Sequence, residues 1–318
     1  AKQIANNKMV SGSPKNHKLG KFLNIIRNII GILILVILVY YVGTNNIFNS
    51  FKSINFLYFP IILVSYISSL LLSTLCISFL IKKKIPFNKL FRCYTLSWVY
   101  GLLLPGKLGE FSLVYFLKKE RLSISTSLVV SFIDKLITFL LFSVITVIGV
   151  FLFFNFRQGI NALILFLIII VMTALAAKIN LLSKIVPKKY KSYIKPFFNE
   201  YHHFFKNDKK RIYKNLYFTL VRWFVDGVSI FMIFLALGIT VNIIYVLIIN
   251  TMTALLSLIP LTANGLGIRQ SAGVYTFSKL NINPAITVNM YLISLSFTYL
   301  IAFSLYSYYS FIQRGDAS

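Results

Sequence analysis

The chain has 318 residues, of which 58% are hydrophobic and only 13% are charged, and its formal net charge is +26. Soluble globular proteins carry about 25% charged residues, so this composition excludes an ordinary soluble domain and predicts an all-α, polytopic integral membrane protein. A β-barrel is disfavoured because its strands alternate apolar and polar residues, whereas runs such as GILILVILVY do not alternate. We attribute the excess of Lys and Arg to loops at the membrane surface and not to nucleic-acid binding.

Six apolar segments are long enough to cross the hydrocarbon core as helices of about 20 residues. They are Phe22–Val42, Phe56–Ile81, Ser125–Phe154, Ile160–Leu182, Leu216–Leu237 and Ile286–Phe311. Two further apolar segments, Phe91–Leu117 and Ile243–Phe277, are interrupted at PGKLGE and PLTANGLGIRQ. The sequence therefore predicts a single transmembrane domain over residues 1–318, with about six full spans and two broken segments.

The distribution of basic residues predicts the orientation of the chain. With the N-terminus in the cytoplasm, 26 of the 33 Lys and Arg residues fall in cytoplasmic segments. Among these segments are a basic arm at residues 1–21 and an amphipathic basic segment at residues 184–214, which we expect to lie on the anionic inner leaflet. Only Lys52, Arg157 and Lys279 fall in segments on the outer side of the membrane, and the remaining four lie within apolar segments. This positive-inside bias predicts a multi-pass protein of the cell membrane with both termini in the cytoplasm.

The two broken segments are predicted to be re-entrant helical hairpins of inverted orientation. Phe91–Leu117 has basic flanks, which places both of its ends inside, and following the spans onward puts both ends of Ile243–Phe277 outside. Proline ends a helix, and glycine lets the backbone turn. The residues expected at the turns are Pro105, Gly106 and Gly109, then Pro260, Gly265 and Gly267. Inverted broken helices that meet near the midplane are typical of transporters; the alternative is two ordinary helix kinks or a cytoplasmic loop.

Charged residues inside apolar segments mark the candidate site. Each costs about 2.5–3.5 kcal/mol at the bilayer centre on insertion scales, so these groups must pair or contact water. Arg222 and Asp226 are four residues apart on one helix face, and Lys107 and Glu110 share a turn. A polar pocket with a spare positive charge suits an anionic head group, and structural ion pairs between helices are the alternative. The candidate substrate-binding residues are Lys107, Glu110, Asp134, Lys135, Arg222, Asp226, Asn264, Arg269 and Gln270.

The sequence predicts no metal site and no cofactor. Cys76 and Cys93 lie within or beside apolar segments without metal-ligand spacing, and the three histidines lie in basic stretches. No Walker motif is present, and GLGIRQ is not a dinucleotide-binding turn, so an ATP-driven pump is unsupported. We expect no secretory signal peptide and no soluble transferase domain, since the longest polar segment has only about thirty residues.

Several motifs in their order along the chain resemble the lysylphosphatidylglycerol synthase transmembrane family. They are PGKLGE followed by a basic patch, the charged pair Asp134–Lys135, RWFVDGVSIFMIFLALGI and IPLTANGLGIRQSAG, and the similarity covers roughly Phe22 to Phe311. The family includes the membrane half of the multiple peptide resistance factor and stand-alone flippase-like proteins. The resemblance implies lipid translocation, in some members coupled to a soluble lipid-modifying domain. The family usually shows Arg-Glu where this chain has Arg269–Gln270, so a proton or ion-pair role does not transfer to Gln270.

We therefore expect a transporter or flippase that moves an anionic, aminoacylated or polyprenyl-phosphate-linked lipid between leaflets through a midplane polar cavity. Two other functions stay open. One is an integral-membrane lipid-modifying transferase with Glu110 or Asp134 as general base; the other is a non-catalytic membrane subunit that recruits such an enzyme. The expected partners are membrane lipids with anionic head groups, with a homo-oligomer or a partner lipid-modifying enzyme as further candidates and no nucleic acid.

Overall fold

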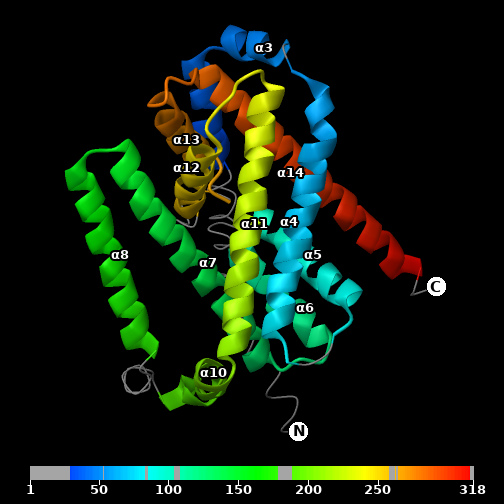
Figure 1. Cartoon of the computed structure of the whole chain (residues 1–318). Helices are drawn as coiled ribbons and strands as arrows, with labels where there is room; N and C mark the ends of the chain where they lie inside the picture. Colours follow the sequence, from blue (N-terminus) through cyan, green and yellow to red (C-terminus); the bar gives the residue numbers. More distant parts are fainter. Residues whose placement is uncertain are drawn as a thin grey trace.

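The computed structural model describes residues 29–52, 54–82, 85–103, 108–177, 188–257, 262 and 264–315. Every secondary-structure element in these ranges is a helix, which confirms the predicted all-α fold (Figure 1). In chain order the elements are the helix Ile29–Val42, α3 (Thr44–Lys52), η1 (Phe56–Tyr58), α4 (Phe59–Leu80), α5 (Phe87–Leu103), η2 (Leu108–Ser112), α6 (Leu113–Lys119), α7 (Ile124–Phe153), α8 (Phe156–Ala177), α10 (Lys188–Asn207), α11 (Lys209–Ala236), α12 (Ile243–Leu256), α13 (Ile268–Ser278) and α14 (Pro284–Gly315).

Four helices in the described part of the chain are long and apolar enough to cross a bilayer: η1 with α4, α7, α11 and α14. The helix Ile29–Val42 and α3, bent by 81° relative to each other, make a fifth when taken as one unit. Helix α8 has 22 residues, packs against α7 and covers most of the predicted span Ile160–Leu182. Length and hydropathy therefore identify four or five spans in the described residues, against the predicted six, and the chain is an all-α membrane protein.

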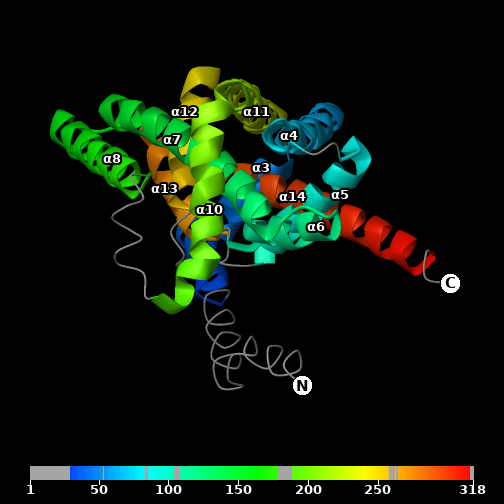
Figure 2. The same ribbon diagram turned by 90° about the horizontal axis from the view of Figure 1, so that it is seen from below.

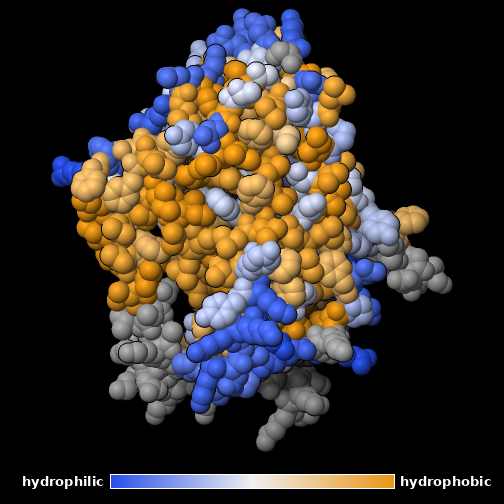
Figure 3. All heavy atoms as spheres, in the orientation of Figure 1, coloured by the Kyte–Doolittle hydropathy of each residue, from blue (hydrophilic) through white to orange (hydrophobic). Residues whose placement is uncertain are grey.

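On the face shown in Figure 3, the described residues are mostly apolar over the middle of the molecule and hydrophilic toward its two ends. Helix α10 crosses the lower end in Figure 1. Its ring side chains Phe197 and Tyr201 pack edge-on against Phe132 of α7. The predicted basic segment 184–214 thus contains α10 and the start of α11, separated at Asp208.

Short polar side chains begin several of the apolar helices. Ser123 Oγ accepts a hydrogen bond from the Thr126 N–H at the start of α7, at 3.1 Å. Asn242 Oδ1 accepts from Ile244 at the start of α12, at 2.9 Å. Such caps satisfy N–H groups that have no partner within the helix, which explains why these helices begin where they do.

The first broken segment folds back on itself, so that η2 and α6 pack against α5. We call α5, η2 and α6 hairpin 1. The Ser97 hydroxyl on α5 donates to the Glu110 carbonyl oxygen on η2 at 2.6 Å. A Cβ at Gly109 would overlap the Tyr100 carbonyl, and one at Gly101 would lie 2.7 Å from Glu110 Cγ. Only glycine therefore allows the two arms to approach this closely.

The second broken segment also turns back, with α13 packed against α12, and we call these two helices hairpin 2. The turn before α13 uses left-handed backbone at Asn264 (φ 47°), Gly265 (φ 71°) and Gly267 (φ 81°). A Cβ at Gly267 would lie 2.8 Å from the Gly31 carbonyl oxygen, so the turn also packs against the helix Ile29–Val42. The predicted turn residues Pro105, Gly106 and Pro260 lie outside the described residues.

Helices α4 and α11 pack against each other over much of their length. Seen from below, α7, α8 and hairpin 2 lie on one side of this pair and hairpin 1 lies on the other (Figure 2), while α14 packs against both α13 and α5. Asn215 of α11 donates to the Cys76 carbonyl of α4 at 2.9 Å, and the Tyr66 hydroxyl of α4 lies 2.6 Å from Ser294 Oγ of α14. These polar contacts join the helices where apolar packing in lipid gives little preference for one partner over another.

Candidate functional site

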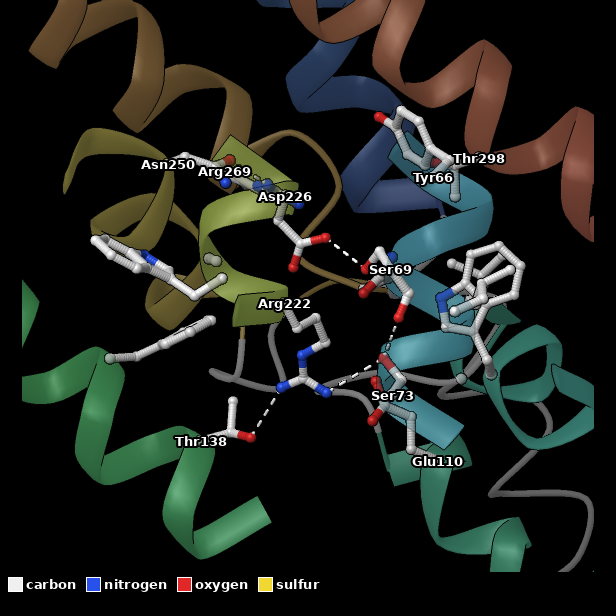
Figure 4. Close-up of a pocket in the computed structure, with 18 of the residues that line it drawn as sticks. Tyr66, Ser69, Ser73, Glu110, Thr138, Arg222, Asp226, Asn250, Arg269 and Thr298 are labelled. Carbon is white, nitrogen blue, oxygen red and sulfur yellow. Dashed lines mark hydrogen bonds between the residues drawn. The ribbon is translucent and has the colours of Figure 1, made fainter. Parts of the chain in front are cut away.

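A cavity of about 540 Å³ lies between α4, hairpin 1, α7, α11, hairpin 2 and α14. Charged and polar side chains from both hairpins and from the spans between them face it (Figure 4). The predicted site residues that line it are Glu110, Lys135, Arg222, Asp226, Asn264, Arg269 and Gln270. Residues up to 160 positions apart in the sequence therefore line one cavity. The hypothesis that the two hairpins converge requires such a shared cavity.

Lys135 joins hairpin 1 to α7 at one side of the cavity. Its ammonium group forms an ion pair with Glu110 and lies 3.3 Å from Asp134 Oδ2. Asp134 itself does not line the cavity: it is 0% exposed, and its Oδ1 accepts a hydrogen bond from Asn215 of α11 at 3.1 Å. Asp134 therefore stabilises the contact between α7 and α11, and Glu110 and Lys135 reach the cavity.

Arg222 of α11 is the most deeply placed cation that lines the cavity, with 8% exposure. Its Nη1 donates to Ser73 Oγ at 3.3 Å, and its Nη2 donates to Thr138 Oγ1 at 3.0 Å. Figure 4 shows the guanidinium lying between these two hydroxyls. Among the described residues no carboxylate oxygen lies within 4 Å of it, so Arg222 and Asp226 do not form the ion pair that was the alternative to head-group binding, although both side chains face the same space.

Asp226 and Arg269 lie on the part of the cavity nearest hairpin 2. Asp226 Oδ1 accepts a hydrogen bond from Ser69 Oγ of α4 at 2.5 Å. Arg269 Nη2 donates to Asn250 Oδ1 at 2.7 Å, which links α13 to α12. Arg269 Nε is buried without a hydrogen-bond partner, and no carboxylate in the described chain lies within 4 Å of this guanidinium. Arg269 therefore keeps hydrogen-bonding capacity that its protein contacts do not use.

Gln270 holds the turn of hairpin 2. Its Oε1 accepts a hydrogen bond from the Gly267 N–H at 2.7 Å, and the residue is 3% exposed. This contact satisfies one of the N–H groups at the start of α13. An amide oxygen thus serves as an acceptor where the resemblance leads one to expect a carboxylate. Asn264 lies in the same turn and lines the cavity, and Lys107 lies outside the described residues.

Sequence reasoning missed the neutral polar residues that hold the arginines. Ser73, Thr138 and Asn250 accept hydrogen bonds from the two arginines, and Ser69 likewise donates to the carboxylate of Asp226. Ser69 and Ser73 are four positions apart on α4, so a helical wheel of this span would have found a polar stripe. Such stripes are ambiguous because serine and threonine hydroxyls in membrane helices also bond to their own backbone, as Ser73 does with the Ser69 carbonyl at 2.8 Å.

This arrangement suits recognition of a charged group more than metal chemistry. No cluster of three His, Cys, Asp or Glu side chains that could hold a metal ion exists in the described residues. Two arginines instead line the cavity with hydroxyl and amide oxygens as hydrogen-bond partners. A buried guanidinium attracts an anion strongly because little water screens its charge.

Comparisons with known proteins agree with the family indicated by the motifs. The chain matches the family described as the lysylphosphatidylglycerol synthase TM region over residues 28–305. It is also similar to a UPF0104 membrane protein of Methanocaldococcus jannaschii, with 29% identity over 232 residues that cover 67% of this chain and 89% of the relative. No solved structure matches the chain. The match over both hairpins and all the cavity-lining helices identifies the chain as a member of the lysylphosphatidylglycerol synthase TM region family.

Proposed function

We propose that this protein moves a lipid with a phosphate-bearing head group between the two leaflets, with the head group passing through the central cavity. The observation that carries the proposal is Arg222, a cation with 8% exposure whose protein partners at the cavity are two neutral hydroxyls. A charge at membrane depth is unfavourable by about 2.5–3.5 kcal/mol on insertion scales. An anionic ligand would relieve this cost, and hydroxyl groups alone relieve it only in part.

Arg269, which lies on hairpin 2, supports the same assignment. It is held by Asn250, and its Nε has no partner among the described residues. Two arginines that reach one cavity from α11 and α13 can both donate to phosphate oxygens, for which guanidinium geometry is well suited. Asp226 and Glu110 line the same cavity, and we expect them to contact the amino group of an aminoacylated or zwitterionic head group.

Two hairpins that enter the membrane from opposite faces, as the basic residues predict, would support alternating access as the mechanism. Hairpin 1 contributes Glu110 and hairpin 2 contributes Asn264, Arg269 and Gln270 to one space. Movement of one hairpin and then the other would open this space to each leaflet in turn, as in other transporters with broken helices. The positive-inside bias assigns the α10 end to the cytoplasm, so hairpin 1 would control the inner opening.

The test is transport by the purified full chain in liposomes that contain tail-labelled phosphatidylglycerol, with dithionite quenching to measure exchange between leaflets. We expect Arg222→Gln to slow transport about 10- to 100-fold, because hydrogen bonds to charged groups contribute about 1.5–3 kcal/mol and about 1.4 kcal/mol is tenfold. Arg211→Gln is the matched control: Arg211 lies on the same helix but pairs with Asp208 and does not line the cavity.

The same liposomes separate transport from the lipid-modifying alternative. A flippase leaves the mass of the lipid unchanged, whereas a transferase changes it, so the lipid is recovered and weighed by mass spectrometry. Equal transport rates for the parental protein, Arg222→Gln and Arg211→Gln would contradict the head-group site. A change in the mass of the lipid would show that the protein is a lipid-modifying transferase and not a flippase. Folding of each variant is checked by its melting temperature.

A further inference from the structure

A second hollow lies on α14, next to the central cavity. It is shallow and open, and among the described residues it is lined by α14 alone. The lining residues are Leu292, Leu295, Ser296, Tyr299, Leu300 and Phe303. We call this hollow the α14 groove. Leu300 and Phe303 are 64% and 72% exposed, so these side chains are not part of the packed core.

The α14 groove and the cavity occupy adjacent faces of the same helix. Tyr291, Ser294 and Thr298 line the cavity, and their hydroxyls make that face polar. Residues of the groove follow at helical spacing on the next face, which is apolar except for the hydroxyls of Ser296 and Tyr299. Leu295 lines both hollows. The polar space and the apolar groove therefore meet at this one side chain.

We infer that the α14 groove holds an acyl chain of the lipid whose head group occupies the cavity, and that Leu295 marks the point where the molecule passes from polar to apolar surroundings. This inference rests on the proposed function, because it assigns the second half of the same amphiphilic ligand. A chain kept inside the cavity would take water and hydrogen bonds away from Arg222, Asp226 and Arg269, which is unfavourable. A chain that leaves over Leu295 stays in contact with apolar side chains and lipid.

Two features of the fold favour this exit over others. The C-terminal half of α14 projects from the helix bundle (Figures 1 and 2), and it begins with Leu300 and Phe303, the two most exposed residues of the groove. Helix α8 is also exposed, for example at Ile164 and Leu167, but none of its residues lines the cavity. An acyl chain that contacts α8 belongs to a lipid of the surrounding bilayer. An acyl chain that contacts α14 can belong to a lipid whose head group lies in the cavity.

Photolabelling tests the inference. The full chain is reconstituted in vesicles with phosphatidylglycerol that carries a diazirine in one acyl chain, irradiated, and mapped by mass spectrometry. We expect labels on the α14 groove at least threefold above those on the exposed face of α8. We also expect Arg222→Gln to lower the groove labels at least threefold and to leave the α8 labels unchanged, because only the groove chain is anchored by a head group.

A second pair of variants tests the junction without touching a charged residue. Leu295→Trp places a larger side chain where the cavity and the α14 groove meet. It should reduce both groove labelling and transport at least fivefold, and Leu167→Trp on α8 should change neither. Groove labels equal to α8 labels in the parental protein, or parental transport by Leu295→Trp, would overturn the inference. If groove labels depend on Arg222 but no lipid crosses the bilayer, the acyl site stands and the proposed transport fails.

Discussion

Lys135 of α7 forms an ion pair with Glu110 of η2, and this contact fastens hairpin 1 to a membrane-spanning helix. The same ammonium group lies 3.3 Å from Asp134 Oδ2. One cation thus balances a carboxylate that faces the cavity and another that is buried against α11. Any movement of hairpin 1 relative to α7 must break or carry this ion pair.

Loss of Lys135 should therefore harm the protein more than loss of Glu110. Lys135→Met removes the cation that contacts both carboxylates and should lower the free energy of unfolding by about 3–5 kcal/mol, the usual effect of breaking a buried ion pair by removing one partner. Glu110→Gln keeps a hydrogen-bonding side chain and leaves Lys135 with Asp134, so its effect should be smaller. Thermal melts of both variants in detergent show which substitution lowers the melting temperature more. Equal melting temperatures for the two would show that the ion pairs contribute little.

The close approach within hairpin 1 predicts a different order for two glycines. Gly109→Ala should destabilise the protein by about 1–3 kcal/mol or more, as overpacking does, because its Cβ would overlap the Tyr100 backbone. Gly101→Ala should be better tolerated, since its Cβ would meet the flexible side chain of Glu110 at 2.7 Å. Melting temperatures and expression levels measure both effects. A milder effect for Gly109→Ala than for Gly101→Ala would contradict the observed packing of η2 on α5.

The cap at Gln270 can be tested by exchanging its acceptor. Gln270→Leu removes the oxygen that accepts from the Gly267 N–H and should cost about 0.5–2 kcal/mol of stability, the usual range for a lost helix cap. Gln270→Glu keeps an acceptor and adds a negative charge in the first turn of α13, where the helix dipole favours it. We expect Gln270→Glu to melt at or above the parental temperature. A loss of stability equal to that of Gln270→Leu would rule out the capping role.

The orientation can be measured by cysteine labelling. Cysteines introduced singly at Lys119, at the end of α6, and at Lys279, just after α13, should react with a membrane-impermeant maleimide from opposite sides, the first from the cytoplasm and the second from outside. The positive-inside bias is the reason for this expectation. Cys76 and Cys93 are both buried, so background labelling should be low. Labelling of Lys119→Cys from outside would mean that the first broken segment crosses the bilayer.

Much of the fold was predictable from local properties of the chain. Runs of apolar residues identify helices that must lie in lipid, because an unpaired backbone there is unfavourable. The breaks at PGKLGE and PLTANGLGIRQ predicted where two segments turn, and the structure has left-handed backbone at Asn264, Gly265 and Gly267. The number of spans was less well determined. The helix Ile29–Val42 and α3 are bent by 81° relative to each other, and they count as a span only if they are taken as one unit.

The sequence by itself determined the class of protein and the charged residues that needed an explanation, because hydropathy and the cost of a charge in lipid depend on each residue and its neighbours along the chain. Only the tertiary structure decided the partners of those charges. Arg222 contacts Ser73 and Thr138 from two other helices and does not pair with Asp226, which lies four residues away on the same helix. Lys135 likewise pairs across to Glu110. Side-chain partners depend on which helices pack together and at what rotation, and several rotations of an apolar helix have similar energies in lipid.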